Sequence, residues 1–417
     1  MTTPVLLALT GSAFESSVVV ALQGQEREGV HIVRRCVDVA DLVAAATTGQ
    51  ARAALIAADL PHLDADVVAR LRASQVEPLG VVGDETHAAT HRLHQIGIGA
   101  VLPAQGPDDL AGRIVASLAS TDAPPVGAVD VGDEDAVADA ELGRVVAVWG
   151  PAGAPGRSTV AVGLAAELAE LGTSTLLIDA DVYGGSVAQQ LAMLDDASGL
   201  LAAARSAKVG ALDPAGLAGH CRQVGSLRVL TGLPRPDRWP ELSPASMSSV
   251  LASARSLASV VVVDCAFSLE SDEDLMFDTA APRRNGATLT VLEQADRVIA
   301  VGAADPVGLS RLARAVVDLG SAVPGCDPAV VVNRMRGSLG WQAAEVTTMI
   351  ERFTGRRSVA VLPEDRAACD RALLHGRTLT GCAPGSALTA GLGDLAADVL
   401  GVPQPRRGRR WRARRVP

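Results

Sequence analysis

The sequence of 417 residues is almost without lysine and is poor in aromatic side chains. Lys208 is its one lysine, which leaves arginine for 36 of the 37 Lys and Arg residues. Because aromatic residues make up 2%, valine, leucine and alanine must fill most of any core. The arginine bias is typical of a GC-rich genome, which weakens any argument from a single Arg-for-Lys exchange. The two side chains still differ, since arginine is a planar fork and lysine a compact charge.

Long apolar runs are also missing. No run reaches the roughly 18 residues of a membrane-spanning helix. The first residues lack the basic segment and apolar stretch of a secretory signal. The six cysteines are scattered without a C-x-x-C pair, which favours reduced thiols over a disulfide framework. These absences predict a cytoplasmic protein, either free or peripheral at the inner face of the cell membrane.

Residues 1–118 alternate short apolar runs with helical patterns, which predicts a flavodoxin-like α/β domain. The segment Gly99–Pro103 is similar to one in response-regulator receiver domains. The receiver chemistry is absent, because the first strand ends in Leu9-Thr10-Gly11 without clustered carboxylates, and no lysine lies near Pro103. Asp59 lies two residues before Pro61, where receivers usually have four. We interpret this domain as a pseudo-receiver that serves for docking.

Two segments of strongly biased charge flank the second half of the chain. Residues 119–143 form an acidic Pro/Gly linker, with seven acids between Asp122 and Glu141 and no basic residue. Residues 403–417 form a tail with seven arginines around Trp411, and removing these from the net charge of −10 leaves −17. Three interpretations of the tail are open: contact with an anionic membrane surface, nonspecific DNA contact, or a solubilising tail.

Residues 144–402 repeat a strand-then-helix pattern, which predicts a mostly parallel sheet covered by helices on both faces. The apolar run Arg144–Trp149 is followed by the glycine-containing segment 150–159 and then by helical spacing over 159–171. Strand, loop and helix in this order form the context of a phosphate-binding loop. Its consensus falls on 151–158, with Pro151 in place of the first glycine and Arg157 in place of the lysine.

Polar residues follow three further predicted strands, at the edge of the sheet where ligands bind in such folds. They are Asp179 and Asp181 after the second strand, Asp264 after the fourth, and Asn333 after Val330–Val332. Together with the loop, their order resembles the MinD/ParA family of deviant-Walker ATPases, and within it the CpaE/TadZ-like septum site-determining branch. That branch also joins a degenerate receiver to such a domain.

The resemblance implies ATP or ADP with Mg²⁺ as ligand and a homodimer as the assembly. It places the cofactor contacts on Gly153, Gly156, Arg157, Ser158, Thr159 and Asn333, with the Asn333 amide at the adenine. It places Mg²⁺ on Ser158, Asp179 and Asp264, partly through water. The same resemblance makes Asp181 the residue that positions the attacking water and Arg157 the degenerate loop cation. The family's signature lysine, which reaches the partner's phosphates across the dimer, is Ala152 here.

The departures from the family loop predict a damaged ATP site. Pro151 and Pro155 have no N–H to offer a phosphate, and Ala154 replaces a glycine where positive φ is expected. Losing the signature lysine is expected to slow hydrolysis by about 10²–10³-fold. We predict weakened or optional nucleotide binding and slow or absent hydrolysis. The alternative is a loop kept as scaffold, with Arg157 in a salt bridge to Asp181 or Asp264.

Two function classes follow. The first is a nucleotide-responsive regulator of septum-site placement in cell division, or of polar pilus positioning, whose partners are division or pilus-assembly proteins. The second is a nucleotide-independent adaptor that docks partners through its two domains. A related tyrosine kinase is disfavoured, since Tyr183 is the only tyrosine.

Two smaller features have open interpretations. His87, His91 and His94 share a helical face, which suits either a metal site or a solvated surface. Arg235, Arg238 and Trp239 suit a partner-binding hot spot, unless Trp239 packs as a lid on the core.

Overall fold

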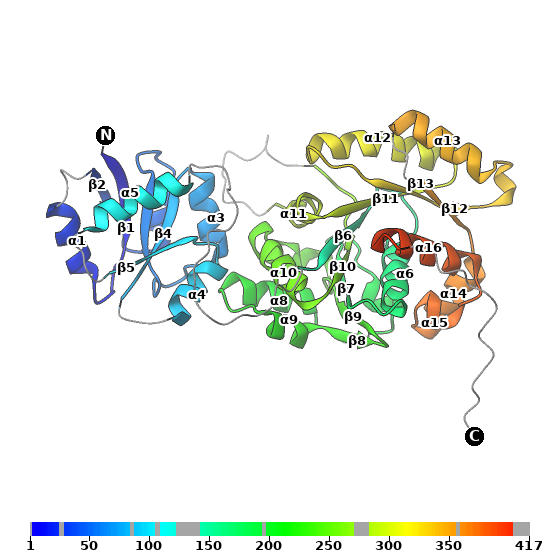
Figure 1. The fold of residues 1–417 in the computed structure, drawn as a ribbon, viewed down its shortest axis with the longest axis horizontal. Helices are drawn as coiled ribbons and strands as arrows, with labels where there is room; N and C mark the ends of the chain where they lie inside the picture. Colours follow the sequence, from blue (N-terminus) through cyan, green and yellow to red (C-terminus); the bar gives the residue numbers. More distant parts are fainter. Residues whose placement is uncertain are drawn as a thin grey trace, which may run out of the picture.

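The computed structural model describes residues 2–24, 29–83, 87–104, 109–121, 142–193, 197–270, 283–355 and 359–402. The predicted tail and residues 122–141 of the predicted linker lie outside these ranges. Two sheets are present, each with helices on both faces (Figure 1). We refer to residues 2–121 as the first α/β unit and to residues 142–402 as the second α/β unit.

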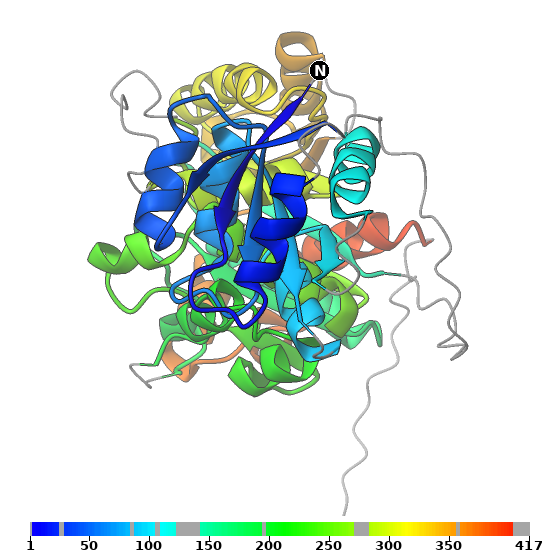
Figure 2. The ribbon, with the colours of Figure 1, turned by 90° about the vertical axis from the view of Figure 1, so that its left-hand side faces the viewer.

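The first α/β unit contains a five-stranded parallel sheet in the order β2-β1-β3-β4-β5, which is the flavodoxin-like order. Side chains that alternate along β1 enter two separate cores, with Leu6 against α2 and α3 and Leu7 against α1 and α5. Figure 2 looks onto this unit. Its elements are β1 (Thr3–Ala8), α1 (Glu15–Gly24), β2 (Val30–Arg35), α2 (Val39–Ala46), β3 (Ala53–Ala57), α3 (Ala65–Ala73), β4 (Glu77–Val82), α4 (His87–Gln95), β5 (Ala100–Pro103) and α5 (Leu110–Thr121).

The second α/β unit contains an eight-stranded sheet in the order β13-β12-β11-β6-β10-β7-β9-β8. Its strands are β6 (Arg144–Trp149), β7 (Thr175–Ala180), β8 (Arg222–Val224), β9 (Leu227–Leu230), β10 (Val260–Cys265), β11 (Arg297–Ala303), β12 (Ala329–Met335) and β13 (Val359–Pro363). Seven strands are parallel, as predicted, and the short β8 pairs antiparallel with β9 at the edge.

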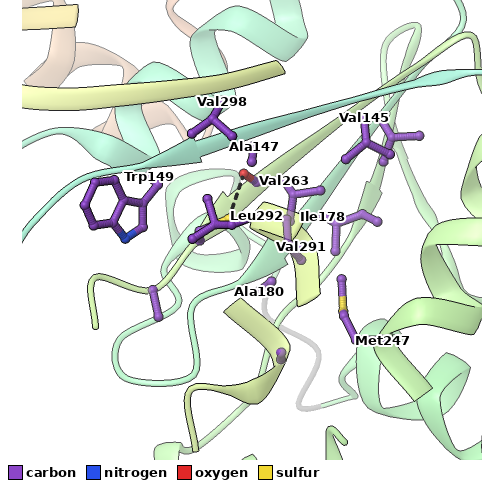
Figure 3. Close-up of a cluster of buried hydrophobic side chains, with 14 of the residues drawn as sticks. Val145, Ala147, Trp149, Ile178, Ala180, Met247, Val263, Val291, Leu292 and Val298 are labelled. Atoms are coloured by element: carbon purple, nitrogen blue, oxygen red, sulfur yellow. Dashed lines mark hydrogen bonds between the residues drawn. The ribbon is translucent and has the colours of Figure 1, made fainter. Parts of the chain in front are cut away.

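Alternating side chains of β6 again enter two cores. Val145, Ala147 and Trp149 lie in the core shown in Figure 3, whereas Val146 and Val148 face the other side of the sheet. The helices of the first face are α8 (Gly199–Lys208), α9 (Pro214–His220), α10 (Pro244–Leu257), α11 (Gly286–Gln294), α12 (Pro306–Ala322) and α13 (Ala343–Thr354). Those of the second are α6 (Arg157–Glu170), α7 (Val187–Gln190), α14 (Arg366–His375), α15 (Leu379–Cys382) and α16 (Ala387–Leu400). In the described part of the chain, none of the helices is both long and apolar enough to cross a membrane.

The two units are in contact through α3 and α4 of the first and α8 and α10 of the second (Figure 1). Ala245 of α10 packs against the core of the first unit. The polar contacts include Lys208 Nζ to Asp66 Oδ2 (2.7 Å), Arg92 Nε to Val209 O (3.2 Å) and Gln95 Nε2 to Leu212 O (3.1 Å). The turn after α8 therefore connects the second α/β unit to the first through hydrogen bonds.

Replacing Gly210 in this turn with alanine is expected to separate the two units. Gly210 has φ +67°, and a Cβ there would lie 2.8 Å from Ile96 Cγ2 and 2.9 Å from the Arg92 carbonyl oxygen. Small-angle X-ray scattering should show a larger radius of gyration. Gly225→Ala is the matched control, because Gly225 has φ +60° with nothing within 4 Å. It should lose about 1 kcal/mol of stability and keep its radius. An unchanged radius for Gly210→Ala would contradict this contact.

Candidate functional site

The site lies where the carboxyl ends of β6, β10 and β7 meet at the centre of the second sheet. In this part of the sheet β10 lies between β6 and β7. Asp264 of β10 pairs in register with Asp179 of β7 and with Val148 of β6. Residues paired in this way project to the same face, and the alternation along both strands directs the two carboxylates toward the face that α6 covers.

The loop between β6 and α6 turns through two glycines of positive φ, Gly153 (+74°) and Gly156 (+89°). Ala154 has no positive φ, so the expectation of positive φ at this position is wrong. Its N–H donates to the Pro151 carbonyl oxygen at 2.9 Å and is used within the loop. Gly156 is the N-cap of α6 and has no side chain to cap the N–H groups of the first turn. These N–H groups and the helix dipole form an anion-binding site.

The Arg157 guanidinium is engaged by oxygen atoms of the protein itself. Its Nη2 donates to Asp181 Oδ2 at 3.0 Å and its Nη1 to the Gly150 carbonyl oxygen at 2.9 Å. Both side chains of the ion pair are largely buried, with 14% and 6% of their surface exposed. The sequence predicts Arg157 either as the cation of the phosphate loop or as the partner of Asp181 or Asp264 in a salt bridge. The structure has the salt bridge to Asp181. A bound phosphate would compete with this carboxylate for the guanidinium.

Asp181 is held by its neighbours as well as by Arg157. Its Oδ1 accepts the N–H groups of Tyr183 (2.9 Å) and Gly184 (3.1 Å). With Oδ2 paired to Arg157, the carboxylate is engaged on both sides. In this arrangement it does not present a free oxygen to water, and its predicted water-positioning role requires the ion pair to open.

Asp179 and Asp264 are buried acids in contrasting surroundings. Asp179 accepts N–H groups from Asp181 (3.2 Å) and Val187 (3.0 Å), and burial raises its pKa to about 6. Neither oxygen of Asp264 has a well-formed hydrogen bond. Burial, followed by the charge of Asp179, raises the pKa of Asp264 well above its ordinary value, although Ser158 and Arg157 act in the opposite direction. A buried carboxylate without a partner is costly, and such a group marks a functional site more often than a structural one.

Aromatic side chains cover the Arg157–Asp181 pair. The ring centroids of Tyr183 and Phe267 lie 4.7 Å apart, and the Arg157 guanidinium lies 6.0 Å from the Phe267 centroid. The Tyr183 hydroxyl donates to Asn285 Oδ1 at 2.9 Å. Phe267 and Asn285 were not predicted from the sequence, because Phe267 lies just beyond β10 and Asn285 is the N-cap of α11, at positions that match no motif.

A cavity of about 440 Å³ opens beside the loop, between α6, the end of β12 and α14. Asn333 lies at its wall and is buried, and its Nδ2 donates to the Pro155 carbonyl oxygen at 3.0 Å. This side chain therefore ties β12 to the loop, and this bond uses one of its two amide N–H groups. The other lining residues include Gly156, Thr159, Arg334, Asp365 and Cys369.

The smaller predicted sites lie elsewhere. His87, His91 and His94 are exposed along α4, and His94 Nδ1 lies 2.9 Å from the Ile98 carbonyl oxygen. Among the described residues, no group of three or more His, Cys, Asp or Glu side chains is arranged to hold a metal ion. Trp239 packs against the first-face core, which favours the lid interpretation over a binding hot spot.

A glycine-containing loop between a strand and a helix, with acids on the neighbouring strands, defines a P-loop nucleotide-binding fold. Residues 141–214, which include this loop, match the family model ParA, described as NUBPL iron-transfer P-loop NTPase.

Two solved structures extend the likeness. The structure of a ParA family ATPase from Chlorobium tepidum TLS is 20% identical, covers 61% of this chain and 98% of its own, and gives a TM-score of 0.51. The structure of the cell division ATPase MinD of Pyrococcus furiosus is 19% identical and covers 62% of this chain and 99% of its own. Its TM-score is 0.50. No curated protein matches the chain. The chain therefore contains the fold of ParA- and MinD-type P-loop NTPases.

Proposed function

We propose that this protein is a ParA/MinD-type nucleotide-binding regulator with weak or absent ATP hydrolysis. The observation that carries the proposal is the buried carboxylate of Asp264, which has no well-formed hydrogen bond, beside an uncapped P-loop helix. The carboxylate calls for a cation, and the free N–H groups of the helix N-terminus call for an anion. Mg²⁺ bound to a nucleotide would supply both. The Arg157–Asp181 ion pair accounts for the weakness, because the loop cation is already engaged.

The residues fit Mg²⁺ that arrives with a nucleotide. Ser158 would hold it directly, and Asp179 and Asp264 would hold it partly through water. Mg²⁺ keeps several waters and binds through one or two protein oxygens plus the phosphates, which agrees with the lack of a preformed metal cluster among the described residues. The ion would neutralise phosphate charge, and Gly153, Gly156 and Thr159 would contact the phosphates. The cavity beside Asn333 has room for a base.

The proposed role is septum-site placement or polar positioning of pilus machinery, as in the branch that the sequence resembles. The partners would be a second copy of the chain and division or pilus-assembly proteins. The first α/β unit, as a pseudo-receiver, would provide a docking surface. Contact with an anionic membrane or DNA through residues 403–417 is part of the same proposal.

An adaptor that works without nucleotide is the second candidate, and one observation favours it. Arg157 gives Asp181 a counter-charge from within the chain, so this pair needs no ligand to be neutral. Under this hypothesis the loop is a scaffold, and the two α/β units act only as docking surfaces.

Titration with labelled ATP and Mg²⁺ should detect binding to the wild type, with turnover far below the roughly 10 s⁻¹ that is typical of enzymes. Arg157→Lys is expected to raise turnover for two reasons. A compact ammonium suits the phosphates, and the guanidinium fork that binds Asp181 is no longer present. Arg157→Ala should weaken binding, with circular dichroism to verify its fold.

Turnover at the typical level would contradict weak hydrolysis. No detectable binding of nucleotide by the wild type would identify the loop as a scaffold. Size-exclusion chromatography with and without ATP separates the two functions, since only the regulator should shift toward a dimer when ATP is added.

A further inference from the structure

The phosphate loop has few positive charges of its own. Arg157 is committed to Asp181 and Gly150, and Ala152 stands where the resembling family has its signature lysine. Pro151 and Pro155 also remove two N–H donors. A nucleoside polyphosphate carries several negative charges, so a loop of this kind needs a cation from another element.

Arg311 places a guanidinium against this loop. It lies in the second turn of α12, which begins at the carboxyl end of β11. Because β11 is the neighbour of β6, this end of α12 lies beside the loop. A Cβ built on Gly153 would collide with Nη1 of Arg311 and lie 3.7 Å from its Cζ. The guanidinium thus rests on the bare Cα of Gly153, at a residue that requires positive φ.

Arg311 is also available for a ligand. The residue is exposed, and no hydrogen bond or ion pair joins it to another described residue. It differs in this from Arg157, whose two Nη atoms are both donating to protein oxygens. The α12 N-terminus is closed by its own cap, since Asp305 accepts the Gly308 N–H at 2.9 Å. The cap leaves Arg311 as the charged group that α12 presents to the loop.

We propose that Arg311 supplies, from the same chain, the phosphate-binding cation that the loop lacks. The inference rests on the proposed nucleotide-binding function and adds a residue that matches no motif of the sequence. Arg311 binds the phosphates of a nucleoside polyphosphate at Gly153, next to the position from which the signature lysine has been lost. Because the charge comes in cis, phosphate binding at this position does not require a second copy of the chain.

The test is a titration of labelled ADP and ATP with Mg²⁺ against the wild type, Arg311→Ala and Arg311→Lys. Arg311→Ala is expected to weaken affinity by about tenfold, the scale of one charge-assisted contact. Arg311→Lys should recover most of this loss because it keeps the charge. All three proteins should have the same melting temperature, since the side chain is exposed.

Arg352→Ala is the matched control. It also removes one exposed helical arginine, but from the last turn of α13, which precedes the start of β13 and so lies at the amino ends of the strands, away from the loop. It should bind as the wild type does. If Arg311→Ala binds as tightly as Arg352→Ala, the inference is overturned while the proposed function stands. Tighter binding by Arg311→Ala also overturns it, because the arginine would then obstruct the loop. A wild type that binds no nucleotide overturns both proposals.

Discussion

Arg157→Ala should lower the free energy of unfolding by about 3 kcal/mol, as expected when one partner of a buried ion pair is removed. The change deletes the hydrogen bonds to Asp181 and Gly150 and leaves Asp181 with 5% of its surface exposed and no cation. Asp179 and Asp264 lie beside it, so three acids would share a buried space. Chemical denaturation at neutral pH measures the effect.

Arg72→Ala is the matched control for this experiment. Arg72 and Glu77 form an ion pair with the same N–O distance, 3.0 Å, but 44% of the Arg72 side chain is exposed. Solvent screening limits such a pair to about 0.5 kcal/mol. Equal losses in the two variants would show that the Arg157–Asp181 pair is not buried in solution.

Asp264→Asn should have the opposite effect on the free energy of unfolding from Arg157→Ala. It should stabilise the protein by about 2 kcal/mol at neutral pH. Neither oxygen of Asp264 has a well-formed hydrogen bond, so an uncharged amide of the same shape removes an unfavourable buried charge and breaks no well-formed bond. Asp179→Asn is the contrasting variant. It should show no such gain, because both Asp179 oxygens accept backbone N–H groups that an amide nitrogen cannot satisfy.

The pH dependence of this gain follows from the raised pKa of Asp264. A carboxyl whose pKa is higher in the folded state than in the unfolded state stabilises the fold when protonated, and this contribution is lost as pH rises through the folded pKa. The asparagine variant has no such loss, so its advantage should grow from about pH 4 upward. Denaturation at about pH 4.5 and about pH 7.5 measures it. A gain of the same size at both values would contradict the assignment.

Much of the second sheet is readable from the sequence because its strands are local apolar runs. The predicted bounds of β6, Arg144–Trp149, are those of the structure. Asp264 is predicted to follow its strand, but β10 continues through it to Cys265, since Asp264 stays in the ladder although it is polar. We missed β8, because three residues at an edge carry no periodic signal.

The site itself is only partly readable. The loop and the acids are set by strand ends, and their meeting at one edge follows from parallel topology. The direction that a long side chain takes does not follow in this way. Arg157 could either reach the phosphates or form a salt bridge, and both options agree with the sequence. The choice depends on Gly150, Asp181 and Phe267 being close in space. Arg311 lies 158 positions beyond Gly153, with no motif to connect them.

The isolation of Lys208 gives the chain a chemical handle. Its ε-amine is the only one among the side chains, and it lies between Asp64 and Asp66 at the contact of the two α/β units. Reagents that acylate or reductively methylate amines therefore have one lysine to modify. Its rate of modification reports whether the units are closed. A ¹³C-methyl group placed there would give one lysine signal in the NMR spectrum, which its higher pKa separates from the signal of a methylated α-amine. Opening on addition of nucleotide or partner could then be followed without engineering a label.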